Sequence, residues 1–485
     1  MSKFFVESLV GFRTLNVRKV AAFAVGPIGG AAFGFITLPI IAWFYSAEDI
    51  GRVSMLQVFS SFCILLFSLG LDQAYVREYH ETENKPALLK IAMFPGLLLF
   101  AVGLALCFMA PGFISSTLFS VDSVFISLLV ALCFLATFIS RFLSLILRMQ
   151  ERGLAFSVSQ VLPKLLFLSV IGFYVLFSFG FDLLHLVIAH AISIVAVTLL
   201  YGWNSRQEFF AALKQRVDKN RLKAMLRFGA PLILGGVAFW GMTAMDKVFL
   251  RSLSTFEELG VYSVATSFAA AAIIFQSVFS IVWAPTVYKW SAEGVNSDKI
   301  DLVTDYVLFA VVVLFCIAGV FSWIITYVLP PSYERVQYIL LSCMAYPLFY
   351  TLSETTVVGL GVARKSSYVM LAALIGCATG VTGSYFLIPL YGASGAAVSS
   401  AIAFWIFFFC RTEFSSLIWR PLPRFRLYLQ TLACLSLSIG FTFKGEDYHA
   451  EFIFFWGGLL VLSVFLNRNL LVGVFKNLGY RRGAI

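Results

Sequence analysis

Long runs of apolar residues are the feature of this sequence that most restricts its fold. A helix needs about 20 apolar residues to cross the roughly 30 Å hydrocarbon core of a bilayer at about 1.5 Å per residue. Fourteen such runs follow one another along the 485 residues. Their approximate limits are 20–45, 53–73, 88–110, 123–147, 156–178, 183–203, 228–250, 259–285, 302–328, 336–361, 367–388, 392–418, 426–442 and 452–467. The runs are continuous rather than alternating in polarity, which predicts helices and not the strands of a membrane β-barrel.

The composition excludes a water-soluble protein. Hydrophobic residues make up 60% of the chain and charged residues 12%, against about 45–50% and about 25% in an average globular protein. So few charges cannot form the polar surface that water requires. The sequence therefore predicts an all-α polytopic membrane protein with about 14 transmembrane helices. A count of 12 or 13 stays open, because the last two runs are short and the run 392–418 is interrupted at Cys410-Arg411.

The positive charges predict the orientation of the chain. If the N-terminus is cytoplasmic, 28 of the 35 Lys and Arg lie on the cytoplasmic side and 5 on the opposite side, while Arg141 and Lys164 lie inside runs. Cytoplasmic loops of membrane proteins carry such an excess. Both termini are therefore predicted to be cytoplasmic. The net charge of +10 is then expected to face anionic lipid, and no nucleic-acid partner is expected.

An internal repeat predicts how the spans are grouped. Segments 23–54 and 228–263 both have a Pro near the start, a Gly-Gly pair soon after, and an acidic pair followed by an apolar residue and Gly. Six spans separate the copies, so they share one orientation and form a parallel repeat. We predict an N-terminal six-helix lobe (1–203), a basic cytoplasmic linker (204–227), a C-terminal six-helix lobe (228–418), and two extra helices with a cytoplasmic tail (419–485).

Signs of catalytic or metal chemistry are missing from the sequence. None of the eight cysteines forms a C-x-x-C pair, and the four histidines show no ligand spacing with one another. The loops on the non-cytoplasmic side are too short to fold as a catalytic domain. We therefore expect no metal, no cofactor, no catalytic residue and no enzymatic activity.

Four stretches carry a resemblance to a known family. They are Leu38-Pro39 through Glu48-Asp49-Ile50-Gly51; Gly70-Leu71-Asp72-Gln73 with Arg77; Asp246-Lys247 through Leu259-Gly260-Val261-Tyr262-Ser263; and Leu387-Ile388-Pro389-Leu390-Tyr391-Gly392 through Ala397. With them the chain resembles the bacterial polysaccharide and O-antigen flippases, in the multidrug/oligosaccharidyl-lipid/polysaccharide exporter superfamily. Ala378-Thr379-Gly380 stands where members often carry Asn. The lipid II flippases are richer in arginine along the first helix, which disfavours lipid II as the substrate.

The resemblance implies a transport function. Members export an undecaprenyl-diphosphate-linked oligosaccharide, the repeat unit of O-antigen or another surface polysaccharide, across the bacterial cytoplasmic (inner) membrane. Alternating access is the expected mechanism, without covalent chemistry. The implied partners are the lipid-linked oligosaccharide, membrane lipids and the polysaccharide polymerase or other assembly proteins.

Two basic residues inside spans are the candidates for binding the diphosphate. A charge at the centre of a transmembrane helix costs about 2.5–3.5 kcal/mol on insertion scales, so each one suggests a function. Arg141 lies in the cytoplasmic half of its span, and Lys164 follows Pro163 about eight residues into the next. The alternative is that both side chains extend to the cytoplasmic interface.

Five further residues are candidates for coupling or gating. Glu354 lies inside the tenth span, where it could bind a coupling proton or cation, pair with Arg141 or Lys164, or form a structural hydrogen bond between helices. Asp246 and Lys247 lie near the outer end of their span and are expected to join helix to loop rather than gate a pathway. Asp72 and Arg77 are five residues apart, do not share a helix face, and are expected at the membrane interface.

Two other functions compete with the flippase. A cation-coupled multidrug antiporter belongs to the same superfamily, but such exporters usually bind their cation with acids in the first lobe, and the first span here has none. A membrane glycosyltransferase or polymerase of the same pathway is the rival of another class. The short outer loops argue against it.

Overall fold

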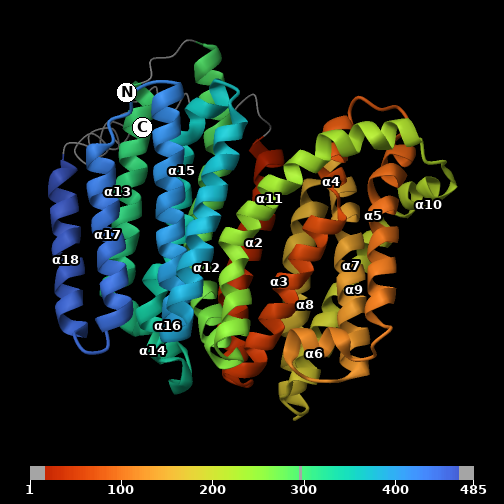
Figure 1. Cartoon of the computed structure of the whole chain (residues 1–485), viewed down its shortest axis with the longest axis horizontal. Helices are drawn as coiled ribbons and strands as arrows, with labels where there is room; N and C mark the ends of the chain where they lie inside the picture. The colour runs from red at the N-terminus through yellow and green to blue at the C-terminus, as the bar shows by residue number, and fades with distance from the viewer. Residues whose placement is uncertain (1–16, 294–297, 469–485) are drawn as a thin grey trace, which may run out of the picture. The chain divides into compact units, whose positions relative to one another are not determined.

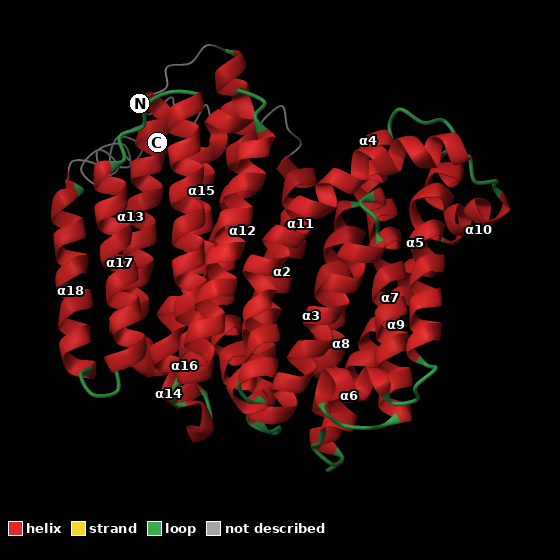
Figure 2. Ribbon diagram, in the orientation of Figure 1, coloured by secondary structure: helices red, strands yellow, loops and turns green. Residues whose placement is uncertain are grey.

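The computed structural model describes residues 17–293 and 298–468, and these form α-helices joined by short turns (Figures 1 and 2). The ends of the chain, including the predicted cytoplasmic tail from 469 onward, lie outside the described residues. The helices are α2 (Val17–Ala42), α3 (Ala47–Phe67), α4 (Leu71–Glu78), α5 (Lys85–Cys107), α6 (Phe113–Phe119), α7 (Val124–Met149), α8 (Gly153–Leu176), α9 (Leu183–Asn204), α10 (Arg206–Lys214), α11 (Lys219–Leu253), α12 (Phe256–Ala292), α13 (Asp298–Val320), α14 (Ile325–Val328), α15 (Val336–Val362), α16 (Ser366–Ile418), α17 (Phe425–Lys444) and α18 (His449–Leu466).

The predicted fold class is confirmed. Within the described residues, eleven helices are long and apolar enough to cross a bilayer. One of them, α16, has 53 residues and contains two of the predicted runs, which meet at Gly392 (φ 52°, ψ −126°). The apolar part of α2 (Ile28–Ala42) and the 20-residue α17 fall on further predicted runs. Each of the fourteen runs overlaps a helix, so the chain is a multi-pass, all-α membrane protein with about 14 spans.

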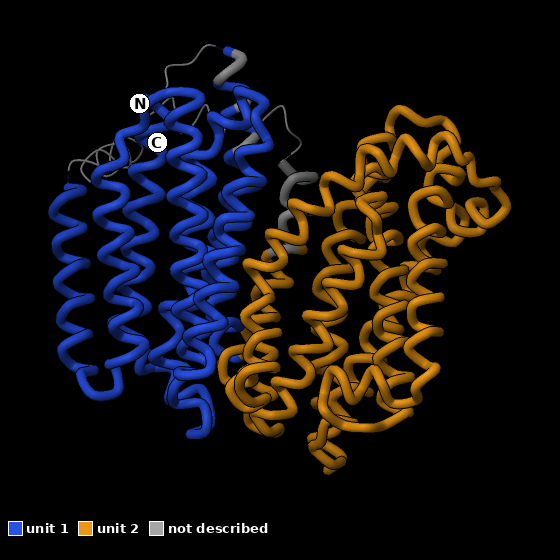
Figure 3. The backbone as a smooth tube through the Cα atoms, in the orientation of Figure 1, with its two compact units in different colours: residues 1–24, 264–485 blue, residues 25–263 orange. Residues whose placement is uncertain are grey.

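Contacts between Cα atoms divide the chain into two compact units (Figure 3). The first, which we call the 25–263 unit, contains α3 to α11 with most of α2 and the start of α12. The second contains residues 264–485 with residues 1–24, and thus α13 to α18. The division into two six-helix lobes with a linker at 204–227 describes the order of the spans and stays a prediction.

Short polar side chains begin several of the helices. Ser46 Oγ accepts a hydrogen bond from the backbone N–H of Asp49 at the start of α3, at 3.1 Å. Asn84 and Asp182 make the same kind of bond at the starts of α5 and α9. Such caps satisfy the first N–H groups of a helix, which have no partner within it. At Asp182, burial raises the pKa of the carboxyl, but hydrogen bonds from the backbone and ring of His185 outweigh it and leave the pKa lowered.

Reciprocal glycine contacts join the repeated segments inside the 25–263 unit. A Cβ atom on Gly51 would lie 2.0 Å from the carbonyl oxygen of Phe256, and one on Gly260 would lie 1.9 Å from that of Ala47. Gly51 and Gly260 occupy equivalent places in the two repeated sequences, as do Ala47 and Phe256. The starts of α3 and α12 therefore pack backbone to backbone through equivalent positions of the two segments.

One expectation about an irregular segment is wrong. The run 392–418 is not interrupted at Cys410-Arg411, since α16 continues to Ile418 and the Arg411 side chain turns into the protein, where the residue is 5% exposed. The predicted linker segment 204–227 contains α10 and the first turns of α11. Lys90 Nζ donates to the carbonyl oxygens of Leu213 and Gln215 at the end of α10 (2.7 and 2.6 Å) and holds it against α5.

Candidate substrate-binding site

Lys164 is a cation within a bundle of apolar helices. It lies on α8 directly after Pro163, and its ammonium donates a hydrogen bond to the backbone carbonyl of Gly30 on α2. A Cβ atom on Gly34, one helical turn along α2, would lie 2.9 Å from Nζ, so the glycine leaves room for the ammonium. Across the described part of the chain, no carboxylate lies within ion-pair distance of Lys164. A carbonyl dipole therefore solvates this charge without neutralising it.

Arg141, the other predicted diphosphate ligand, has an acidic partner. Its Nη2 donates to Asp72 Oδ2 at 2.7 Å, which joins α7 to α4. The Arg141 side chain is 37% exposed and the Asp72 side chain only 9%. Asp72 also accepts a hydrogen bond from Gln73 (3.0 Å). Arg141 and Lys164 thus bind different partners on different helices, and the partly exposed guanidinium keeps donors for a ligand.

Asp72 and Arg77 lie on α4 but bind different groups. Asp72 is turned into the 25–263 unit toward Arg141, whereas the Arg77 guanidinium lies 4.3 Å from the centroid of the Phe228 ring on α11. Next to this contact, a Cβ atom on Gly70 would lie 2.3 Å from the carbonyl oxygen of Gly229. The turn before α4 is therefore packed tightly against the first turns of α11.

Asp246 and Lys247 lie near the end of α11 in the same unit. Asp246 is 7% exposed, and its carboxylate accepts hydrogen bonds from the Tyr262 hydroxyl on α12 and from the backbone N–H of Lys247 (2.7 Å for the latter). Asp246 and Tyr262 both belong to the stretch that resembles the flippases. Their bond ties α11 to the first turns of α12, and the expected role of Asp246 and Lys247 in joining helix to loop stays a prediction.

Glu354 has a partner that the sequence did not indicate. It pairs with Arg411 of α16, Nη2 to Oε1 at 2.8 Å, and not with Arg141 or Lys164. Arg411 Nη1 donates to Ser353 Oγ at 2.6 Å. The guanidinium lies 4.9 Å from the ring centroid of Phe407 and 5.4 Å from that of Tyr350. This charged cluster lies in the interior of the 264–485 unit, between α15 and α16.

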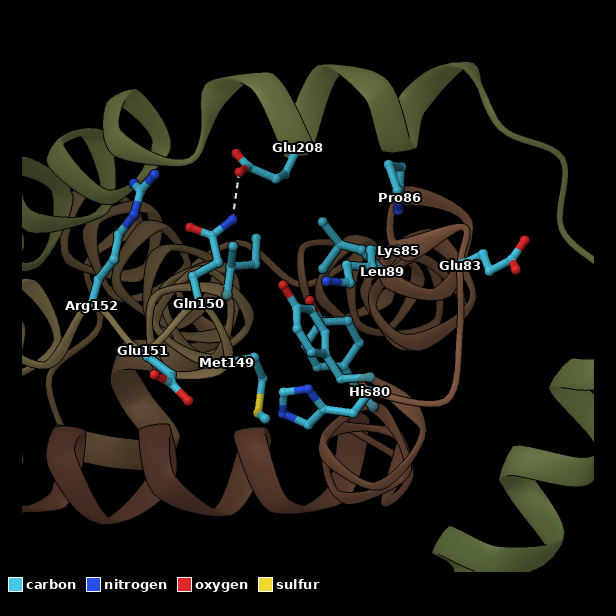
Figure 4. Close-up of a pocket in the computed structure, with 13 residues that line it drawn as sticks. His80, Glu83, Lys85, Pro86, Leu89, Met149, Gln150, Glu151, Arg152 and Glu208 are labelled. Carbon is cyan, nitrogen blue, oxygen red and sulfur yellow. Dashed lines mark hydrogen bonds between the residues drawn. The ribbon is translucent and has the colours of Figure 1, made fainter. Parts of the chain in front are cut away.

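A polar cavity lies at one end of the 25–263 unit (Figure 4). It has a volume of about 600 Å³, the size of a small-molecule site. Burial, together with the nearby Glu208 carboxylate, raises the pKa of the Tyr79 phenol, which stays a neutral donor at physiological pH. Glu208 of α10 accepts a hydrogen bond from Gln150 at 2.5 Å, so α10 closes one side of the cavity. The charged lining residues are His80, Glu83, Lys85, Glu151, Arg152 and Glu208.

Two ion pairs of the candidate residues had no signal in the sequence. Arg411 was counted with the cytoplasmic charges, because it lies near the end of its run, and its partner Glu354 is 57 residues away. The pairing of Arg141 with Asp72 spans 69 residues. A spacing of three or four residues would have shown a pair on one helix, but contacts between helices leave no such spacing. The sequence identified Asp72 and Glu354 as candidates, but it did not indicate that Asp72 pairs with Arg141 or that Glu354 pairs with Arg411.

A family model described as "Polysaccharide biosynthesis protein" matches residues 17–291, more than half of the chain. The chain belongs to this family. The match covers α2 to α11 and nearly all of α12, and therefore Asp72, Arg141, Lys164 and Asp246. A search of the curated proteins gives no significant match.

Two solved transporter structures have the same fold as this chain. One is "Lipid II flippase MurJ, inward closed conformation", with a TM-score of 0.66 and 14% identity over 93% of this chain and 99% of that chain. Another is an inward-facing multidrug resistance MATE family transporter of the MOP superfamily, with a TM-score of 0.55 and 14% identity over 82% of this chain and 97% of that chain. This polysaccharide biosynthesis protein thus shares its fold with these two transporters.

Proposed function

We propose that this protein flips an undecaprenyl-diphosphate-linked oligosaccharide, the repeat unit of O-antigen or another surface polysaccharide, across the bacterial inner membrane by alternating access. The family and the transporter fold support a carrier in polysaccharide biosynthesis. The diphosphate-sugar head group needs a polar path, because charged groups do not cross hydrocarbon unaided, while the polyprenyl tail stays in lipid. Both termini are proposed to be cytoplasmic, and the polymerase and other assembly proteins are the proposed partners.

The observation that carries the proposal is the ammonium of Lys164. A lysine is a compact point charge that binds phosphate well. Because its partner in the described structure is a carbonyl oxygen, a diphosphate can bind without first displacing a carboxylate. Arg141 supplies the second cation, with donors left over from its pair with Asp72. Glu354, Asp246, Lys247, Asp72 and Arg77 remain the candidates for coupling or gating.

Deletion of the gene tests the function against its rivals. The flippase predicts that the complete lipid-linked repeat unit accumulates on the cytoplasmic face and that surface polysaccharide is lost. An incomplete repeat unit would identify a glycosyltransferase instead, and unchanged glycolipids with altered drug resistance would identify an antiporter.

Complementation of the deletion with single variants tests the site. Lys164→Gln is expected to abolish export and Arg141→Gln to reduce it strongly, with each protein present in the membrane at the wild-type level. Lys444→Gln is the matched control, because Lys444 is exposed at the end of α17 and is expected to export normally. Wild-type export by both site variants would overturn the assignment of the diphosphate ligands.

A further inference from the structure

The short helix α10 presents an apolar face that nothing in the 25–263 unit covers. Phe210, Leu213 and Val217 are 60%, 42% and 37% exposed. Phe210 and Leu213 are three residues apart and lie on one side of α10, and Val217 lies in the non-helical segment that follows the helix. The opposite side is in contact with the protein, since Ala212 is fully buried and Glu208 binds Gln150. The segment is therefore amphipathic, with one face docked on the unit and one face open.

The open face continues the lipid-facing surface of a spanning helix. At the end of α9, Leu199 and Trp203 are 68% and 70% exposed, and α9 is apolar enough to cross the membrane. The Arg206 guanidinium lies 4.5 Å from the Trp203 ring centroid and links the end of α9 to the start of α10. Tryptophan at the end of a spanning helix marks the boundary between hydrocarbon and head groups. This contact places α10 at the level of the head groups.

Cations surround the apolar face. Lys214, Arg216 and Lys219 are exposed and follow Phe210 within nine residues, while Asp218 caps α11 with its carboxylate. A helix with an apolar face and flanking Lys and Arg binds in the plane of an anionic membrane surface. Lys90 and the Asn84–Gln215 hydrogen bond (3.1 Å) fix the end of α10 in this position. The helix is therefore already folded and oriented for the bilayer.

From these observations we infer that α10 and the 215–219 turn form a docking site for anionic phospholipid. Phe210, Leu213 and Val217 insert at the acyl boundary, while Lys214, Arg216 and Lys219 bind the phosphate groups of the lipid. The occupant is the bilayer surface and not a soluble anion, because the apolar face needs hydrocarbon contact. The site is separate from the proposed diphosphate ligands, so its test does not depend on transport.

The charge requirement is tested on the purified full-length protein. Thermal stability is measured in detergent with added phosphatidylglycerol, phosphatidylcholine or inorganic phosphate. Phosphatidylglycerol is expected to raise the Tm of the wild type more than the other two additives. The variant Lys214→Gln/Arg216→Gln is expected to bind phosphatidylglycerol about 30-fold more weakly. Lys365→Gln/Lys444→Gln removes the same charge at two other exposed positions and is expected to keep the wild-type response.

The apolar contact is tested by hydrogen exchange in nanodiscs. Residues 206–217 are expected to exchange more slowly in discs that contain phosphatidylglycerol than in discs of phosphatidylcholine alone, and Phe210→Ser/Leu213→Ser is expected to remove this protection. Equal lipid responses in the wild type and in Lys214→Gln/Arg216→Gln would overturn the proposal. Reproduction of the Tm shift by inorganic phosphate, or unchanged protection in Phe210→Ser/Leu213→Ser, would overturn it as well.

Discussion

At the scale of single residues, the basic side chains inside the spans differ in the group that balances their charge. Arg141 and Arg411 each bind a carboxylate on another helix, whereas Lys164 binds a backbone carbonyl. Removing one member of a partly buried ion pair leaves the other charge without a partner, which is costlier than removing both. The same substitution therefore has different consequences at the paired and the unpaired positions.

Variants of the Asp72–Arg141 pair distinguish a structural role of Arg141 from a role in transport. Asp72→Ala is expected to destabilise the protein by about 1–3 kcal/mol, less than a fully buried pair because Arg141 is partly exposed. The double variant Asp72→Ala/Arg141→Ala is expected to recover part of this stability in a thermal melt but not export. Full recovery of export in the double variant would show that Arg141 serves only to balance Asp72.

The Glu354–Arg411 pair is expected to hold α15 to α16. Arg411 is almost completely buried, so Glu354→Gln leaves a guanidinium without its counter-ion and is expected to cost about 3–5 kcal/mol. Glu413→Gln is the control, since its ion pair with Arg424 is more exposed and is expected to contribute under about 1 kcal/mol. Chemical or thermal unfolding of both variants measures the difference, and equal losses would contradict it.

At the scale of helices, close backbone contacts place narrow limits on side-chain size. Gly51→Ala would place a methyl group against the Phe256 carbonyl and is expected to destabilise the protein by about 1–3 kcal/mol, as overpacking does. Gly172→Ala is the matched control, because a Cβ atom there meets no atom within 4 Å, and alanine is favoured over glycine in a helix. Thermal melts of the two variants should move in opposite directions; a neutral Gly51→Ala would show that the two backbones separate easily.

The helices that cross the membrane could be predicted from the sequence, and the short ones could not. Crossing hydrocarbon demands about 20 continuous apolar residues, and that length is visible without any knowledge of the partners. The helix α10 has nine residues, and it is held by Lys90 and Gln150 from distant parts of the chain. Arg411 was misread for a similar reason, because the acid that allows its burial lies on another helix. Contacts between helices determine where α10 lies and why Arg411 is buried, and such contacts cannot be seen in the composition of the chain.

At the scale of the whole molecule, the distribution of charge predicts the topology. With both termini cytoplasmic, a fluorescent protein fused after Lys214 or after Arg468 should fluoresce, and alkaline phosphatase fused at the same positions should be inactive. The opposite result is expected for fusions after Lys444. Fusions to alkaline phosphatase and to a fluorescent protein measure this. Export of the reporter fused after Arg468 would mean an odd number of spans and would contradict the predicted orientation.

The two halves of α16 are joined at Gly392 with almost no loop between them. A positive φ at this glycine reverses the direction of the helix within one residue, and a Cβ atom on Gly395 would lie 2.3 Å from the Leu387 carbonyl oxygen. An epitope tag inserted here has no flexible loop to occupy, so it would have to unwind a helix end. Gly392 is therefore expected to be a poor position for an inserted tag or protease site, because the insertion would disturb the ends of two helices.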